Sequence, residues 1–303
     1  MVNHTPWKKW IIIGGMLPAL IFYLVLGVTP SIVTVFLSFT NVTGVKDVPW
    51  QFIGLKNYFE FFGVRNSRDT VDIMLRTVIF ALAVTVIQNI LALLAAVLLN
   101  SKKLIGRNFV RAIAFLPTIL GVTVTAYTWT LFFDLDGPAS AFLKIFHTQS
   151  LFFGGIKTAF PLVIFVQIWF SLGYAMVIDL AGLQSISQEL YEAADIDGAD
   201  STRRLRYITV PLMWQTLSVN ILLSVIGSLS VVQTILLTTG GAHDSSTLAL
   251  SVFANGFSFQ IPGGSPAAMR QGYAAAQSMI LFLLILIVTV GLQLLVRRRN
   301  KDI

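Results

Sequence analysis

The fold of this chain is decided by the stretch Glu192-Ala193-Ala194-Asp195-Ile196-Asp197-Gly198-Ala199, which the basic run Arg203-Arg204-Leu205-Arg206 follows. It is the longest polar interruption that lies between two membrane-length apolar segments and also carries positive charge. Lys and Arg at the ends of apolar segments mark the cytoplasmic side of a membrane protein. We therefore expect this stretch to be the part of the chain that meets the cytoplasm.

The composition of the rest of the chain indicates a membrane protein. Hydrophobic residues make up 55% of the 303 residues and charged residues 12%, with a mean hydropathy of +0.79. Soluble domains carry about 25% charged residues. The net charge of +7 could suggest a nucleic-acid partner, but the cations cluster at the ends of apolar segments, as topology signals do. The absence of cysteine excludes disulfides, thiolate metal sites and cysteine nucleophiles.

Six segments are long and apolar enough to cross a bilayer, which needs about 20 residues per helix. They are residues 11–38, 72–99, 109–133, 159–182, 210–237 and 273–296. Most Lys and Arg fall on one side of this arrangement, at 8–9, 102–111, 203–206 and 297–301. The positive-inside rule then places both termini and the 192–206 stretch in the cytoplasm. The predicted fold class is all-α: a polytopic membrane protein of six transmembrane helices with a short cytoplasmic loop between helices four and five.

This cytoplasmic loop is predicted to form two short helices. The candidate N-caps are Ser185 or Ser187 for the first helix and Asp200 or Ser201 for the second. The first helix should begin near Gln188, and Asp197-Gly198 is a turn signal. The second helix should lead to Pro211, a residue that suits the first turn of a helix. The alternative is an ordinary polar loop whose arginines only fix the topology.

Polar residues inside apolar spans suggest a transport pathway, because they are costly in a membrane. In the fourth span, Gln167, Ser171 and Tyr174 are spaced i, i+4, i+7 and share one helical face, with Trp169 to one side. In the fifth span a partly hydroxylated stripe contains Ser224, Gly227, Ser228 and Val231. Aromatic rings beside hydroxyl and amide groups suit a sugar. The alternative is that these residues only mediate helix packing, as small and hydroxylated residues often do in membranes.

Two further charged residues bear on the type of transport. Asp179 lies near the cytoplasmic end of the fourth span, so a snorkelled or loop-paired carboxylate is favoured over a proton relay. Arg76 lies near an outer end, and no Arg or Lys lies deep in a span. A phosphate cargo would favour such a cation, so a neutral cargo is favoured.

The stretch from Glu192 to Pro211 resembles the EAA loop of binding-protein-dependent ABC importer permeases. Three further motifs resemble the carbohydrate branch of that family, the maltose and glycerol-phosphate type. They are Leu180-Ala181-Gly182-Leu183-Gln184-Ser185-Ile186, Phe115-Leu116-Pro117 and Thr239-Gly240-Gly241. The chain departs from the usual pattern at Ser187, where proline is common, at Thr202 and Leu205, where aromatic residues are usual, and at Ala242.

The resemblance implies that the loop docks into a cleft on a separate cytoplasmic ATPase and transmits its closure to the helices. The residues carried over as coupling residues are Glu192, Ala193, Ala194, Asp197, Gly198 and Ala199, with Gly198 the most critical. The family also uses the fourth and fifth spans for midmembrane sugar contacts. The candidate substrate-binding residues are accordingly Gln167, Trp169, Ser171, Tyr174, Ser224, Gly227 and Ser228.

The resemblance also implies the surrounding machine: a homologous second permease, two copies of the ATPase, an extracytoplasmic solute-binding protein and a sugar substrate. The chain lacks the phosphate-binding motif Gly-x-x-x-x-Gly-Lys-Ser/Thr, and no catalytic residue, metal site or cofactor is expected in it; ATP and Mg²⁺ belong to the partner ATPase. We expect three parts: an N-terminal tail, first helix and outer loop (1–71), a permease core with the EAA loop at 183–211 (72–296), and a basic tail (297–303).

Its expected location is the cytoplasmic (inner) membrane of a bacterium or archaeon. An alternative keeps the machine but carries glycerol phosphate, a polyol or another small solute. An ion-coupled secondary transporter would need internal repeats and buried midplane carboxylates, which the sequence does not clearly show. A membrane-embedded enzyme would need a catalytic constellation, and the sequence offers no convincing one.

Overall fold

The computed structural model describes residues 6–63, 67–101, 105–262 and 269–299, and it is all-α. The long helices are α4 (Ser67–Asn100), α5 (Arg107–Phe132), α7 (Ala159–Gln184), α11 (Trp214–Leu229) and α14 (Gln271–Arg299). The N-terminal arm consists of α1 (Pro6–Tyr23), the π-helix η1 (Leu24–Val28) and α2 (Thr29–Leu37). Within the described residues, strand pairing is limited to one bridge between Thr40 and Phe52. The predicted fold class is confirmed.

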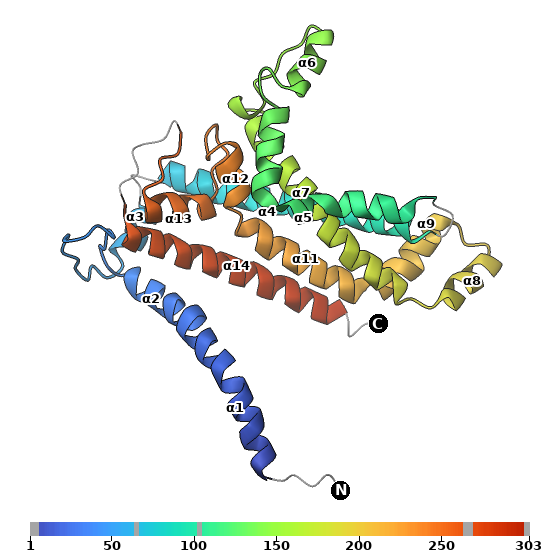
Figure 1. Ribbon diagram of the computed structural model, residues 1–303, viewed down its shortest axis with the longest axis horizontal. Helices are drawn as coiled ribbons and strands as arrows, with labels where there is room; N and C mark the ends of the chain where they lie inside the picture. Colours follow the sequence, from blue (N-terminus) through green and yellow to red (C-terminus); the bar gives the residue numbers. More distant parts are fainter. Residues whose placement is uncertain (1–5, 64–66, 102–104, 263–268, 300–303) are drawn as a thin grey trace.

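Shorter helices connect the long ones. They are α3 (Lys56–Phe62), α6 (Pro138–Ile145), the 3₁₀ turn η2 (Phe152–Gly154), α8 (Gln188–Ile196), α9 (Ser201–Arg204), the π-helix η3 (Leu205–Thr209), α10 (Val210–Leu212), α12 (Gln233–Thr238) and α13 (Leu248–Phe257). In Figure 1, α4, α11 and α14 run along the molecule, with α3 and α13 at one end and α8 and α9 at the other, whereas α5 is kinked at Gly121 and its second half turns toward α6. The α1–α2 arm and α6 point away from the bundle on opposite sides.

Five stretches of the described residues are long and apolar enough to cross a membrane. They are Gly14–Leu37, Arg68–Asn100, Arg107–Phe132, Ala159–Gln184 and Gln271–Arg298. A sixth crossing is possible if Ser201–Leu212 and Trp214–Leu229, which meet at a bend of 75°, count as one span. If this bent pair is counted as one span, the structure has the six spans that the sequence predicts.

The predicted fifth span, residues 210–237, is wrong as a single helix. Its start is bent between α10 and α11, and its end is interrupted between α11 and α12. Pro211 has no backbone N–H, which leaves the preceding turn without its usual hydrogen bond. At the other end, the Ser228 and Ser230 hydroxyls donate to the carbonyl oxygens of Val225 and Ile226. Such back-bonding competes with the helical pattern and bends helices.

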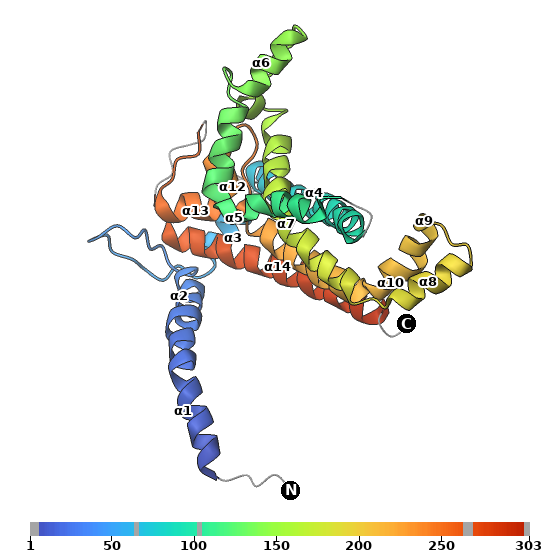
Figure 2. The ribbon, with the colours of Figure 1, turned by 45° about the vertical axis from the view of Figure 1, so that its right-hand side comes forward.

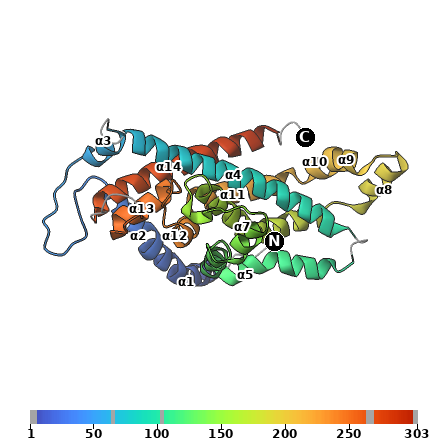
Figure 3. The ribbon, with the colours of Figure 1, turned by 90° about the horizontal axis from the view of Figure 1, so that it is seen from above.

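The centre of the bundle is formed by α4, α7 and α11. In Figure 3, α4 lies over the middle of the bundle, between the ends that carry α3 and α8. One-third of the apolar window is buried in each of α4 and α7, whereas none of the Gly14–Leu37 window is buried. Figure 2 shows the N-terminal arm standing clear of the bundle. The three central helices therefore carry much of the buried packing of the bundle, while the arm is exposed along nearly all of its apolar window.

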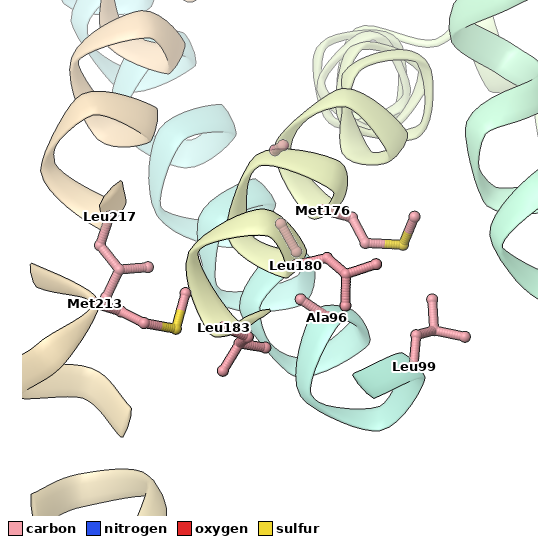
Figure 4. Close-up of a cluster of buried hydrophobic side chains, with 9 residues drawn as sticks. Ala96, Leu99, Met176, Leu180, Leu183, Met213 and Leu217 are labelled. Carbon is pink, nitrogen blue, oxygen red and sulfur yellow. The ribbon is translucent and has the colours of Figure 1, made fainter. Parts of the chain in front are cut away.

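A buried cluster joins these three helices near the α8 end (Figure 4). Its members are Ala92, Ala96, Leu99, Ala175, Met176, Leu180, Leu183, Met213 and Leu217. Lipid is as apolar as leucine, so close van der Waals packing, aided by small residues, holds helices together in a membrane. At Gly173 an added Cβ would lie 2.3 Å from the Ala114 carbonyl oxygen. The glycine therefore sets how closely α5 and α7 approach.

The opposite end is held by polar contacts between α3 and its neighbours. The Asn57 amide donates to the carbonyl oxygens of Ser38 and Thr40 at 2.9 and 2.8 Å. Both guanidinium nitrogens of Arg270 donate to the Glu60 carboxylate, at 2.8 and 2.6 Å. Phe61 is buried, with 1% of its surface exposed. The Asn57 contacts attach α3 to the segment after α2, and the Arg270–Glu60 pair attaches α3 to the start of α14.

Candidate functional site

Two of the predicted cap alternatives are selected in the loop between α7 and α11. The Ser187 hydroxyl accepts a hydrogen bond from the Glu189 N–H at 3.3 Å and caps α8. The Asp200 carboxylate accepts from the Arg203 N–H at 2.7 Å and caps α9. Each bond satisfies an N–H that the first turn of a helix leaves free. The predicted pair of short helices is confirmed, and Ser187, a departure from the family pattern, supplies a cap.

The turn after α8 needs a glycine. The Ala199 N–H donates to the Ala194 carbonyl at 2.9 Å, and the Gly198 N–H donates to the Asp195 carbonyl at 3.2 Å. This pair of bonds is the Schellman motif, in which the residue after the C-cap is left-handed. Gly198 has φ of +71°, and a Cβ added there would meet no atom within 4 Å. The turn therefore projects into open space at the tip of the loop.

The six candidate coupling residues do not all face outward. Glu192, Ala193, Asp197 and Gly198 are exposed, Ala199 is half-buried and Ala194 is buried. The Glu192 carboxylate accepts a hydrogen bond from the Gln188 side-chain amide at 2.8 Å, one turn earlier on α8. Ala194 serves the turn through its carbonyl group. The exposed candidate coupling residues are thus small or acidic, and they surround a glycine tip.

The two halves of the loop are braced against each other. Arg204 on α9 forms an ion pair with Asp195 on α8. The Tyr191 hydroxyl lies 3.0 Å from the Thr209 hydroxyl of η3. Because α8 follows α7 and η3 leads through α10 into α11, the loop is connected directly to both helices.

A cavity of about 100 Å³ lies between α4, α7 and α11, midway along them. Its lining residues are Val84, Gln88, Gln167, Ser171, Tyr174, Asn220, Leu223, Ser224, Gly227 and Ser228. Small-molecule sites usually occupy roughly 300–1,000 Å³. The cavity is therefore smaller than a usual small-molecule site; it is partly open, and its lining residue Tyr174 has 49% of its surface exposed.

Hydrogen bonds across the helices hold this wall together. The Ser171 hydroxyl donates to Gln88 Oε1 at 2.7 Å, and Gln88 Nε2 donates to the Ser224 hydroxyl at 3.2 Å. Asn89 also donates to Ser224, at 3.0 Å. The Thr234 hydroxyl of α12 donates to Gln167 Oε1 at 2.5 Å. Gln88 therefore links α4 to both α7 and α11.

Six of the seven candidate substrate residues line this cavity. They are Gln167, Ser171, Tyr174, Ser224, Gly227 and Ser228. Trp169 does not line it. Its ring packs edge-on against Trp129 of α5, with the ring centroids 5.4 Å apart. Two residues along an α-helix turn the side chain by about 200°, which carries Trp169 away from the face of Gln167.

Sequence reasoning missed Gln88, Asn89 and Asn220, all of which are buried. Their signal was present, since each is an amide inside an apolar helix, where polar side chains are costly. Asp179 is neither snorkelled nor paired with the loop, and that expectation is wrong. Its side chain is fully buried in α7 and accepts a hydrogen bond from Asn220 of α11 at 3.0 Å. Packing between these helices, rather than the bilayer surface, determines its surroundings.

The comparison with known families identifies the chain. A sequence profile described as "Binding-protein-dependent transport system inner membrane component" matches residues 88–301. The chain belongs to this family. The match includes the loop, α7, α11 and the last part of α4 from Gln88 onward. As a member of the family, the chain is a membrane transport component and not an enzyme.

Relatives in this family match almost the whole chain. The trehalose/maltose transport system permease protein MalF of Thermococcus litoralis is 31% identical over 290 residues, covering 95% of this chain and 93% of that protein. The probable starch degradation products transport system permease protein AmyD of Thermoanaerobacterium thermosulfurigenes is 28% identical, covering 97% and 95%. A bacterial ABC transporter for alginate import is 21% identical, with a TM-score of 0.81 over 96% of both chains. That structure shares the fold.

Proposed function

We propose that this chain is a permease subunit of an ATP-driven importer that moves a sugar or oligosaccharide into the cytoplasm. The observation that carries the cargo class is the cavity wall, whose polar members are uncharged amides and hydroxyls. Such groups both donate and accept hydrogen bonds, as sugar hydroxyls do. The sugar-transport names of its relatives support the same class. A phosphate cargo would require a cation, and the residues that line the cavity include none.

We propose the same path of coupling that the family resemblance implies. The loop docks on the ATPase through its exposed residues, with Gly198 at the contact. Glu192, Ala193, Asp197 and Ala199 surround that contact, and Ala194 holds the turn from within. The chain connections support this path, because α8 follows α7 directly and η3 leads through α10 into α11, so the loop is continuous with both helices.

The remaining parts of the machine are proposed from the family to which the chain belongs. A homologous second permease closes the open side, and two copies of a cytoplasmic ATPase bind ATP and Mg²⁺. An extracytoplasmic solute-binding protein delivers the sugar to the end of the bundle opposite the loop. The chain itself carries no cofactor and binds no nucleic acid. Residues 72–296 form the permease core in the cytoplasmic membrane of a bacterium or archaeon, with both termini and the 183–211 loop inside.

The test is ATP hydrolysis by the whole complex reconstituted in liposomes. A panel of neutral mono-, di- and trisaccharides is added one at a time with the binding protein, and glycerol phosphate is included as the charged control. We expect one sugar-loaded form of the binding protein to stimulate hydrolysis and to be taken up. Stimulation by glycerol phosphate alone would contradict the cargo, and a complex without any ATPase would contradict the function.

A further inference from the structure

Asn220 takes part in two environments at once. It lines the cavity, yet only 1% of its surface is exposed. Its amide nitrogen Nδ2 donates to the Ala175 carbonyl oxygen and to Asp179 Oδ1, both at 3.0 Å. Both acceptors belong to α7. One side chain of α11 therefore touches the cavity and is held from the neighbouring helix.

These two bonds determine which way the amide points. A backbone carbonyl can only accept a hydrogen bond, so the nitrogen, and not the oxygen, must face Ala175. The two N–H groups of Asn220 are then both used on α7. The carbonyl oxygen Oδ1 lies on the other side of the amide from these two N–H groups, and Asn220 is one of the residues that line the cavity.

This oxygen differs from the other amide oxygens of the cavity wall. Gln88 Oε1 already accepts from Ser171, and Gln167 Oε1 already accepts from Thr234. Both hydrogen bonds recorded for Asn220 use its nitrogen. Among the amides of the described wall, Asn220 therefore has an oxygen left to accept a hydrogen bond from a guest molecule.

Asp179 lies in a setting that is unfavourable for a carboxyl group. It is completely buried, and its second oxygen, Oδ2, makes no hydrogen bond within the described residues. A buried carboxyl group between membrane helices is costly, and an apolar residue of similar size would pack as well or better. What Asp179 supplies, and an apolar residue could not, is an acceptor for the Asn220 nitrogen.

We propose that Asn220 is a further substrate-contacting residue, whose Oδ1 accepts a hydrogen bond from a sugar hydroxyl, and that Asp179 is the positioning residue that holds this oxygen toward the cavity. The proposal rests on the proposed function, since it deepens the assignment of the same cavity. It goes beyond that assignment in extending the contact surface by one turn toward the loop. It also gives Asp179 a role that is neither a proton relay nor a coupling contact.

The experiment is a double-mutant cycle on uptake by the complete transporter in proteoliposomes, with the neutral sugar that the wild-type complex transports fastest among a mono-, di- and trisaccharide panel. The variants are Asp179→Ala, Asn220→Ala, the double variant and Asp179→Asn. The control is Gln277→Ala, which removes an equally buried amide that bridges α14 to Ser251 of α13, away from the cavity. Apparent KM and kcat are measured for each.

We expect Asp179→Ala and Asn220→Ala each to raise the apparent KM about tenfold with kcat changed less than about threefold, a tenfold change corresponding to about 1.4 kcal/mol. The double variant should be no worse than Asn220→Ala, because Asp179 acts through Asn220. Asp179→Asn keeps an acceptor for the Asn220 nitrogen and should stay within about threefold of the wild type. The control should leave KM unchanged even if the protein is less stable.

Three outcomes would overturn the proposal. A wild-type KM in Asp179→Ala with sugar uptake intact would remove the positioning role. Additive effects in the double variant would show that Asp179 does not act through Asn220. Failure of the proposed function can be told apart from these two results. If the wild-type complex transports no neutral sugar, the cargo class is wrong, and Asn220 Oδ1 has no sugar hydroxyl to bind.

Discussion

The loop between α7 and α11 and the cavity above it use glycine in two different ways. Gly198 at the loop tip and Gly227 at the cavity both have open space where a Cβ would lie. Gly198 has φ of +71°, whereas Gly227 lies inside the regular helix α11. The loop therefore needs glycine for its backbone, and in the proposed function this backbone meets the ATPase. The cavity needs glycine only for the volume that it leaves free.

The largest effect is expected at the loop tip. Gly198→Arg places a long cation at the point that meets the ATPase and strains a left-handed backbone. We expect sugar uptake in proteoliposomes to fall on the order of 100-fold, equivalent to about 2.8 kcal/mol. Membrane insertion should be unchanged. Gly198→Asn is the matched control, since Asn adopts the left-handed region more readily than other residues, and it should keep more activity than Gly198→Arg. Uptake at the wild-type rate by Gly198→Arg would contradict the coupling role of Gly198.

The next effect is expected in the cavity. Gly227→Leu fills the space beside Ser224 and Ser228 with an apolar side chain. We expect uptake to fall by roughly tenfold, or about 1.4 kcal/mol, while the complex still assembles. Gly291→Leu is the matched control, because Gly291 of α14 also has open space around its Cβ position and lies outside the cavity. Equal losses in the two variants would mean that the cavity is not on the transport path.

A packing glycine should affect stability rather than transport specificity. Gly173→Ala would place a Cβ 2.3 Å from the Ala114 carbonyl oxygen and force α5 and α7 apart. Overpacking of this kind costs about 1–3 kcal/mol, so we expect a lower melting temperature of the purified complex. Gly227→Ala, which meets no atom within 4 Å, is the control. An unchanged melting temperature in Gly173→Ala would contradict the close approach of the two helices.

The smallest effect is expected at the brace of the loop. Arg204→Ala removes the ion pair with Asp195, in which 29% and 58% of the two side chains are exposed. Exposed pairs contribute about 0–1 kcal/mol, so uptake should fall less than threefold. Arg203→Ala, which removes the neighbouring cation, serves as the control for lost charge. A complete loss of uptake in Arg204→Ala alone would show that the brace carries more of the coupling than an exposed pair can.

The same contrast explains what could be predicted from the sequence. Caps and turns depend on residues close in the chain, so Ser187, Asp200 and the Gly198 turn were predictable from short patterns. The cavity joins Gln88, Ser171 and Ser224 from three helices, and that pairing depends on packing. Helical spacing put Gln167, Ser171 and Tyr174 on one face, but it could not supply Gln88 of α4 as their neighbour.

The break in the predicted fifth span has a similar cause. Composition identified an apolar segment at 210–237. Hydropathy alone cannot predict that the Ser228 and Ser230 hydroxyls donate to backbone carbonyls, or that the chain bends at Met213. The side chain of Asp179 was predicted to reach the bilayer surface because the residue is close to the cytoplasmic end of the fourth span. Instead it is buried between α7 and α11, where Asn220 donates a hydrogen bond to it.

The central claim, that the loop is the contact with the ATPase, is tested most directly by cross-linking. The chain has no cysteine, so a single cysteine at the exposed position Ala193 can carry a photoactivated cross-linker with no second labelled position on this chain. The control is a cysteine at the exposed Phe142 of α6, the short helix that points away from the bundle on the side opposite the N-terminal arm. The account predicts an adduct between the Ala193→Cys chain and the ATPase subunit, and none from Phe142→Cys. An ATPase adduct from Phe142→Cys but not from Ala193→Cys would contradict it.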